Sequence, residues 1–189
     1  MVRVRKQQEE IKNMKNRFVR ATALSAFAFI GIANAQTGSG SLGVTADVAG
    51  SISLTFVTDA AGVALTGAGT STASLGFGTV SMYSGTPASG VTKTVSGTTS
   101  FSLATPFKIR VDLANSASTA YTLNATLQTA DAINAWAIGA TDISTAGPFA
   151  LTAAGVYGTA ASYTLHLTIP ATAVAGVISN SIGFSAVGG

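Results

Sequence analysis

Few residues of this chain suit acid–base, nucleophilic or metal chemistry. The chain contains one histidine, His166, and no cysteine. Thr164 and Thr168 flank this histidine in an alternating run, which places it on the polar face of an expected strand. A zinc site needs several clustered ligands, and neither H-x-H nor H-E-x-x-H occurs. A Ser/His/Asp triad needs only one residue of each type, but no G-x-S-x-G elbow is present, so we expect no enzyme, catalytic residue, metal or cofactor.

The aromatic residues suggest a second kind of site. Trp136, with Tyr121, Tyr157 and Tyr163, would line a sugar-binding face if the rings were exposed for stacking. Trp136 is therefore a candidate aromatic binding residue. Burial of these rings in a hydrophobic core is the commoner explanation, and the sequence leaves both open.

The N-terminus has the three parts of a secretory signal peptide. Basic residues precede an apolar run at 21–33, which is too short to span a bilayer, and the small-residue motif A-N-A ends at Ala35. We expect residues 1–35 to be a cleaved signal peptide and 36–189 to form one domain. Met14 is an alternative start that would shorten the signal. The protein is then exported through the periplasm to the cell surface or beyond, and meets the membrane only during export.

The expected mature chain contains few charged residues. Removing 35 of the 189 residues leaves 154, with five aspartates against only three cations, Lys93, Lys108 and Arg110. The basic character belongs to the signal peptide, so we expect no nucleic-acid partner. A chain of this length buries roughly 70% of its unfolded surface, which is enough for one domain without disulfides.

Alternating apolar residues predict an all-β fold. In F-K-I-R-V-D-L at 107–113 the apolar side chains share one face and the charged ones the other. The alternating run at 121–127 is the expected hairpin partner of this strand, the run at 98–103 a separate strand, and 177–186 the last strand. Turn residues separate about nine or ten such strands, which is typical of an antiparallel sandwich.

The start of the mature chain has two interpretations. A flexible Gly/Ser lead at 36–41 precedes an alternating run in which Leu42, Val44, Ala46 and Val48 share one face. An ordinary first strand paired within its own chain is the simpler interpretation. The alternative is a donor strand that adds to the open sheet edge of a neighbouring copy.

Two stretches resemble a known family. L-G-F-G-T-V at 75–80 and the closing run that begins Y-T-L-H-L-T-I-P at Tyr163 and ends S-I-G-F at Phe184 are similar to exported bacterial β-sandwich subunits of the spore coat protein U and fimbrial kind. The chain lacks the cysteine pair of many such subunits. The resemblance implies an immunoglobulin-like surface subunit that exchanges a strand with its neighbour.

These observations lead to one predicted function and one alternative. We expect a secreted structural protein of the bacterial cell surface that self-associates, or associates with related subunits, into a pilus-like filament (a fimbrium) or a coat. The alternative is a carbohydrate-binding module for adhesion, with a glycan as its partner.

Overall fold

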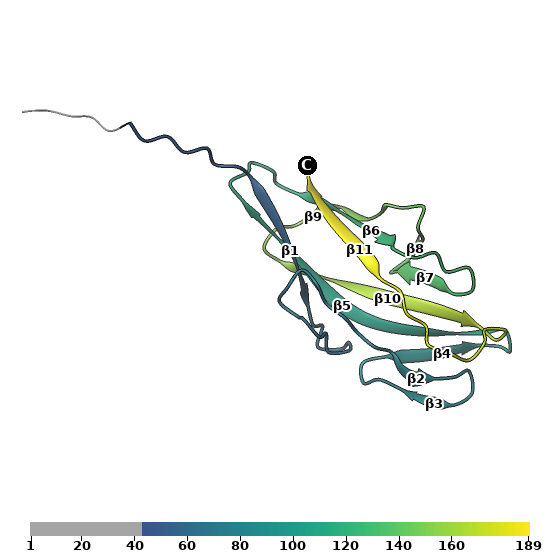
Figure 1. Ribbon diagram of the computed structural model, residues 1–189. Helices are drawn as coiled ribbons and strands as arrows, with labels where there is room; N and C mark the ends of the chain where they lie inside the picture. The colour runs from purple at the N-terminus through teal and green to yellow at the C-terminus, as the bar shows by residue number, and fades with distance from the viewer. Residues whose placement is uncertain (1–42) are drawn as a thin grey trace, which may run out of the picture. The chain divides into compact units, whose positions relative to one another are not determined.

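The computed structural model describes residues 43–189, within which Asp47–Gly189 forms one compact unit (Figure 1). The described residues contain eleven strands and no helix, and every strand pairing is antiparallel. In chain order the strands are β1 (Ser51–Val57), β2 (Gly78–Val80), β3 (Gly85–Pro87), β4 (Thr92–Ser96), β5 (Ser100–Ala114), β6 (Tyr121–Leu127), β7 (Ala135–Ile138), β8 (Thr141–Ile143), β9 (Phe149–Gly155), β10 (Ala160–Pro170) and β11 (Ile182–Gly188).

The all-β prediction is confirmed, but the expected count of nine or ten strands is too low. Three of the eleven strands, β2, β3 and β8, have only three residues each. A strand of that length is too short to show an alternating pattern, so sequence periodicity cannot identify it. The expected signal peptide at 1–35 lies outside the described residues.

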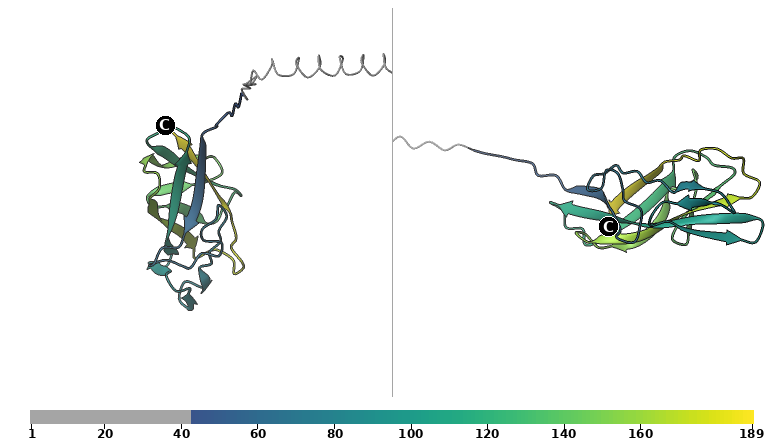
Figure 2. Two further views of the ribbon diagram at one scale, coloured as in Figure 1. Left: turned by 90° about the vertical axis from the view of Figure 1, so that its left-hand side faces the viewer. Right: turned by 90° about the horizontal axis from the view of Figure 1, so that it is seen from below.

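The strands form two larger sheets and one small hairpin. One sheet has the order β1-β5-β10-β7-β8, with β4 also paired to β5; the second has the order β11-β6-β9; β2 and β3 pair with each other. The two larger sheets pack in a sandwich-like arrangement (Figure 2). Their facing side chains form the hydrophobic core, to which β5, β6, β7, β8 and β10 all contribute buried residues.

The longest strand, β5, pairs with three strands of the larger sheet, β1, β4 and β10. Its 15 residues alternate between buried and less buried positions, and Ile109 and Val111 are fully buried. The sequence predicted two strands here, at 98–103 and 107–113, whereas the structure has one. The interruption expected at Pro106 does not occur, and the pairing of β5 explains why.

Pro106 is tolerated inside β5 because no neighbouring strand needs its missing N–H. On one side β5 pairs with β10 along 100–110, and on the other it pairs first with β4, up to Ala104, and then with β1, from Lys108. The carbonyl groups of Thr99 and Val111 point toward β10, so the backbone N–H and C=O groups of the odd-numbered residues of β5 point to that side. The backbone groups of the even-numbered residues, Pro106 included, therefore point to the opposite side, where the gap between β4 and β1 lies.

Thr105 fills the core side of this gap. It is fully buried, and its hydroxyl accepts a hydrogen bond from Val63 N and donates one to Gly90 O, both 3.0 Å long. Gly62 lies directly on the Pro106 carbonyl, where a Cβ atom would overlap the oxygen. Two loops are therefore attached to β5 at the point where no strand pairs with it.

The expected hairpin between 107–113 and 121–127 is wrong. β6 lies in the other sheet, between β11 and β9, while β5 has β10 on one side and β1 with β4 on the other. Both edges of β5 are therefore occupied. The connection at 115–120 instead crosses between sheets, beginning at Asn115, which has a positive φ of 55°.

The ends of the chain also differ from expectation. The last strand begins at Ile182 rather than 177, because residues 177–181 belong to no strand and Val177 is 96% exposed. At the start of the chain, the described residues 43–50 belong to no strand and are all exposed. The simpler interpretation of the alternating run at 42–48, a first strand paired within its own chain, is therefore wrong for its described part.

Replacement of Thr105 by valine tests the importance of the gap. Thr105→Val keeps the shape but leaves Val63 N–H and Gly90 C=O without partners, which should lower the free energy of unfolding by about 2 kcal/mol or more. Thr105→Ser keeps the hydroxyl, loses only a methyl group and should cost about 1 kcal/mol. Urea denaturation measures both, and equal stability of the valine variant and the parent would contradict the assigned role.

Candidate functional site

His166 lies on the outer face of the larger sheet, as the sequence indicates. Its cross-strand neighbours are Ala104 on β5 and Ala137 on β7. The part of the chain that the structure describes contains no cluster of three or more His, Asp or Glu side chains arranged to hold a metal ion. Over the same residues, no helix has the length and hydrophobicity needed to cross a membrane.

The charged residues of β5 form two ion pairs. Lys108 Nζ lies 3.5 Å from Asp59 Oδ2, and Ser162 donates a 2.9 Å hydrogen bond to the same oxygen. The backbone N–H of Ala61, followed by the Ser162 hydroxyl, lowers the pKa of Asp59. Arg110 and Asp112 form a second, more exposed pair at 2.8 Å. The first pair, with the Ser162 hydrogen bond, holds the loop after β1 against the larger sheet.

Trp136, the candidate aromatic binding residue, is part of the core. Its side chain is only 7% exposed, and its indole N–H donates a 2.9 Å hydrogen bond to Asp131 Oδ2. The other oxygen of Asp131 accepts hydrogen bonds from the backbone N–H groups of Ile133 and Asn134. The sequence analysis did not identify Asp131 as the partner of Trp136, although the spacing D-x-x-x-x-W at the start of a strand was visible.

The hydrogen bonds to Asp131 determine its charge state. Desolvation by burial, the largest single influence, acts to raise the pKa of this carboxyl. Hydrogen bonds from Asn134, Trp136 and Ile133 together outweigh desolvation and lower the pKa to about 2. The carboxylate thus connects the loop before β7 to the core through the indole ring.

The three tyrosines of the predicted sugar-binding face, Tyr121, Tyr157 and Tyr163, are likewise placed in or against the core. Tyr121 is 1% exposed, its ring lies 5.2 Å from that of Tyr157, and Gly155 leaves the space that the Tyr121 ring occupies. Tyr163 packs against Phe107. The structure does not bring Trp136 and the tyrosines together as an exposed platform, since Trp136 and Tyr121 are both buried.

The candidate donor residues have a different environment. Val44 and Val48 are 80% and 70% exposed, Ala46 is also exposed, and Leu42 lies outside the described residues. Exposed valines in an alternating run are unusual for a soluble domain, because each buried valine would contribute roughly 1.5 kcal/mol or more. This segment, residues 42–48, is the best candidate functional site, and we call it the donor segment.

Comparisons with protein-family models, with curated proteins and with solved structures gave no match to this chain. The functional argument therefore depends on the geometry described above.

The interaction between Asp131 and Trp136 predicts a pH dependence of stability. Because the folded-state pKa of about 2 lies below the ordinary value of 3.8, the carboxylate stabilises the fold fully above about pH 4, and this contribution is lost as the pH falls towards 2. Asp131→Asn should lower the free energy of unfolding by about 1 kcal/mol near pH 6 and reduce its dependence on acid pH.

Urea denaturation followed by the fluorescence of Trp136, the only tryptophan, at pH 6 and pH 2.5 checks this prediction. Asp142→Asn is the matched control, because Asp142 lies exposed on β8 and no hydrogen bond from the described residues reaches its side chain. An Asp131→Asn variant with the same stability as the parent at both pH values would contradict the role assigned to the carboxylate.

Proposed function

We propose that this chain is a secreted structural subunit of the bacterial cell surface that assembles into a pilus-like fibre or coat by strand addition. In this proposal the domain is an immunoglobulin-like sandwich, it is not an enzyme, and its partner is another copy of the chain or a related subunit. The donor segment of one subunit adds to a sheet edge of the next.

The exposure of the donor segment is the observation that carries the proposal. Its alternating apolar residues have the pattern of a half-buried strand, yet the described residues 43–48 belong to no sheet and are exposed. An extended segment of this kind gains hydrogen bonds and buried apolar area when a second sheet accepts it. Assembly therefore provides the burial that the segment lacks within its own chain.

The composition of the domain also supports a structural role. Beyond residue 35 the chain has eight charged residues, and its surface is mainly Thr, Ser, Asn, Gly and Ala. Such a surface has little charge repulsion between copies, so subunits can pack closely against one another. The sandwich-like core needs no disulfide or metal to bury the apolar face of each strand.

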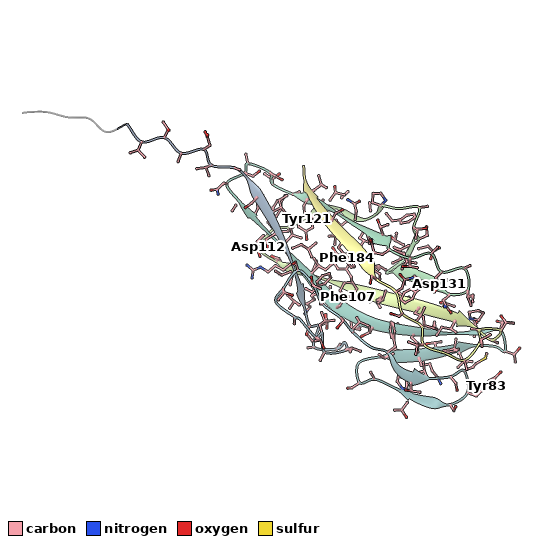
Figure 3. All side chains as sticks on the ribbon, in the orientation of Figure 1. Tyr83, Phe107, Asp112, Tyr121, Asp131 and Phe184 are labelled. Atoms are coloured by element: carbon pink, nitrogen blue, oxygen red, sulfur yellow. The ribbon has the colours of Figure 1, made fainter. Side chains whose placement is uncertain are left out.

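The carbohydrate-binding alternative has less support. Trp136 is 7% exposed, so little of its ring surface is free for a sugar to stack on. Tyr83, in the turn between β2 and β3, is 76% exposed, but Figure 3 shows it at the edge of the molecule, away from the labelled aromatic residues Phe107, Tyr121 and Phe184. One exposed ring offers a sugar less contact area than a platform of several rings.

Substitution of the donor segment tests the proposed function. Replacing Leu42, Val44 and Val48 by serine in the full chain removes the apolar face and should abolish assembly, leaving a folded monomer. The matched control replaces Gly43, Thr45 and Asp47 by serine. These residues lie on the other face of the segment, so the control should assemble like the parent. Size-exclusion chromatography and negative-stain electron microscopy of the exported proteins measure the outcome.

Two results would contradict the proposal. A parent protein that stays monomeric at every concentration would exclude self-assembly, and an apolar-face variant that still forms filaments would exclude the donor segment as the assembling element. In the first case the response of Trp136 fluorescence to a glycan panel tests the adhesive alternative.

A further inference from the structure

The edges of the sheets differ in how they are protected against added strands. In the two larger sheets, the strands with an unpaired side are β1, β4, β8, β9 and β11. Natural sheets block their edges with charges, prolines, bulges, short strands or covering loops. An edge without any of these devices is the one most open to another chain.

Four of the five edges carry such a device. On β4, Lys93 donates hydrogen bonds to the carbonyls of Ser81 and Ser84, which holds the β2–β3 turn beside this edge. β8 has only three residues, and the pairing of β9 with β6 is broken by two register shifts. On β1 the backbone of Phe56 is bonded to Gly69 and Thr70 of the following loop.

β11 has none of these protections. It is seven residues long, pairs with β6 in one continuous register, and contains no charged residue and no proline. Gln128 N donates to Ser181 O, and Gly189 N donates to Ala120 O, so the odd-numbered residues face β6. The N–H and C=O groups of Ile182, Phe184, Ala186 and Gly188 therefore point to the open edge, and no backbone hydrogen bond within residues 43–189 reaches them.

The side chains beside this edge are apolar and only half covered. Phe184 packs against Phe56 on β1 and Phe107 on β5, with ring centroids 5.4 and 5.9 Å away (Figure 3). β1 and β11 thus lie on the same side of the sandwich, at the border between the two sheets (Figures 1 and 2). Near the end of β11 an open hollow of about 530 Å³ is lined by Ile52, Leu113, Gly188 and neighbouring small residues.

We propose that the open edge of β11 accepts the donor segment of a second copy as a fourth strand of the β11-β6-β9 sheet. This inference rests on the proposed function and adds the accepting surface to it. The donor segment and β11 both have seven residues, so they match in length. With Leu42, Val44, Ala46 and Val48 over the core, the only charged donor residue, Asp47, faces solvent.

The contact has a consequence for the shape of the assembly. Donor segment and β11 are different surfaces of the same chain, so the interface is heterologous. Each subunit that donates its segment still has a free β11 edge, and each subunit that accepts still has a free segment. Such contacts extend into a filament or close into a ring, of which a dimer with reciprocal exchange is the smallest.

Engineered cysteines test this inference directly, because the chain has no cysteine of its own. Full chains carrying Thr45→Cys are co-expressed with full chains carrying Ser185→Cys or Val187→Cys, and then oxidised. All three positions are solvent-facing in the proposed interface, and the two β11 positions cover two registers. We expect disulfide-linked dimers with at least one β11 cysteine and none with the control Thr94→Cys on β4, which is exposed and lies on the outer face of its sheet, opposite Ser102.

The other outcomes each overturn the inference in a recognisable way. Assembly with cross-links only to Thr94→Cys means that β4 accepts the segment, and the proposed function then stands without β11. Cross-linked monomers of a Thr45→Cys/Val187→Cys double variant mean that the segment folds onto its own chain. Dimers of Ser185→Cys alone mean that two β11 edges pair with each other. Absence of any assembly contradicts the proposed function itself.

A proline at the open edge gives a second, independent test. Ala186→Pro removes an N–H that points away from β6, so it should leave the fold intact while blocking an added strand and abolishing assembly. Val95→Pro is the matched control, since alternation along β4 also points its N–H outward, and it should assemble like the parent. A folded Ala186→Pro protein that assembles normally would overturn the inference; if this variant does not fold, the cross-linking result decides.

Discussion

The sharing of one side of β5 by two strands is the constraint on which the rest of the fold depends. β4 and β1 both pair with β5 on the side opposite β10, and they leave a gap at Thr105 and Pro106. Proline is tolerated in the gap because no N–H is needed there. The buried Thr105 hydroxyl satisfies polar groups of two loops that a strand would otherwise cover. The core can therefore extend over a 15-residue strand without an unpaired buried group at its centre.

The same arrangement determines which sheet edges remain open. With β10 on one side and β4 and β1 on the other, β5 has no free edge for β6, which lies in the opposite sheet with β11 and β9. β11 is then an outer strand, next to the aromatic contact between Phe56 and Phe184. The proposed assembly uses this edge, since β11 lacks the charged residues with which many soluble proteins protect such edges.

The candidate site illustrates how far side-chain type alone can lead. From the sequence, Trp136 could belong either to a sugar-binding face or to the hydrophobic core, and these two interpretations differ only in whether the ring is exposed or buried. Trp136 is buried because Asp131 accepts its indole N–H, so a polar group inside the domain satisfies the polar end of the ring. In the donor segment the pattern predicts burial, but Val44 and Val48 are exposed.

Alternation in the sequence was sufficient to predict the all-β class, the buried face of β5 and the polar face that holds His166, because the pleat of a strand sends successive side chains to opposite faces. Alternation says nothing about neighbours, which is why the hairpin of β5 with β6 was wrong and why β5 was divided at Pro106. Only the tertiary structure decided which strands pair, that residues 43–48 lie outside the sheets, and that β11 is left open. Pairing depends on which edges are already occupied, and that is a property of the whole chain.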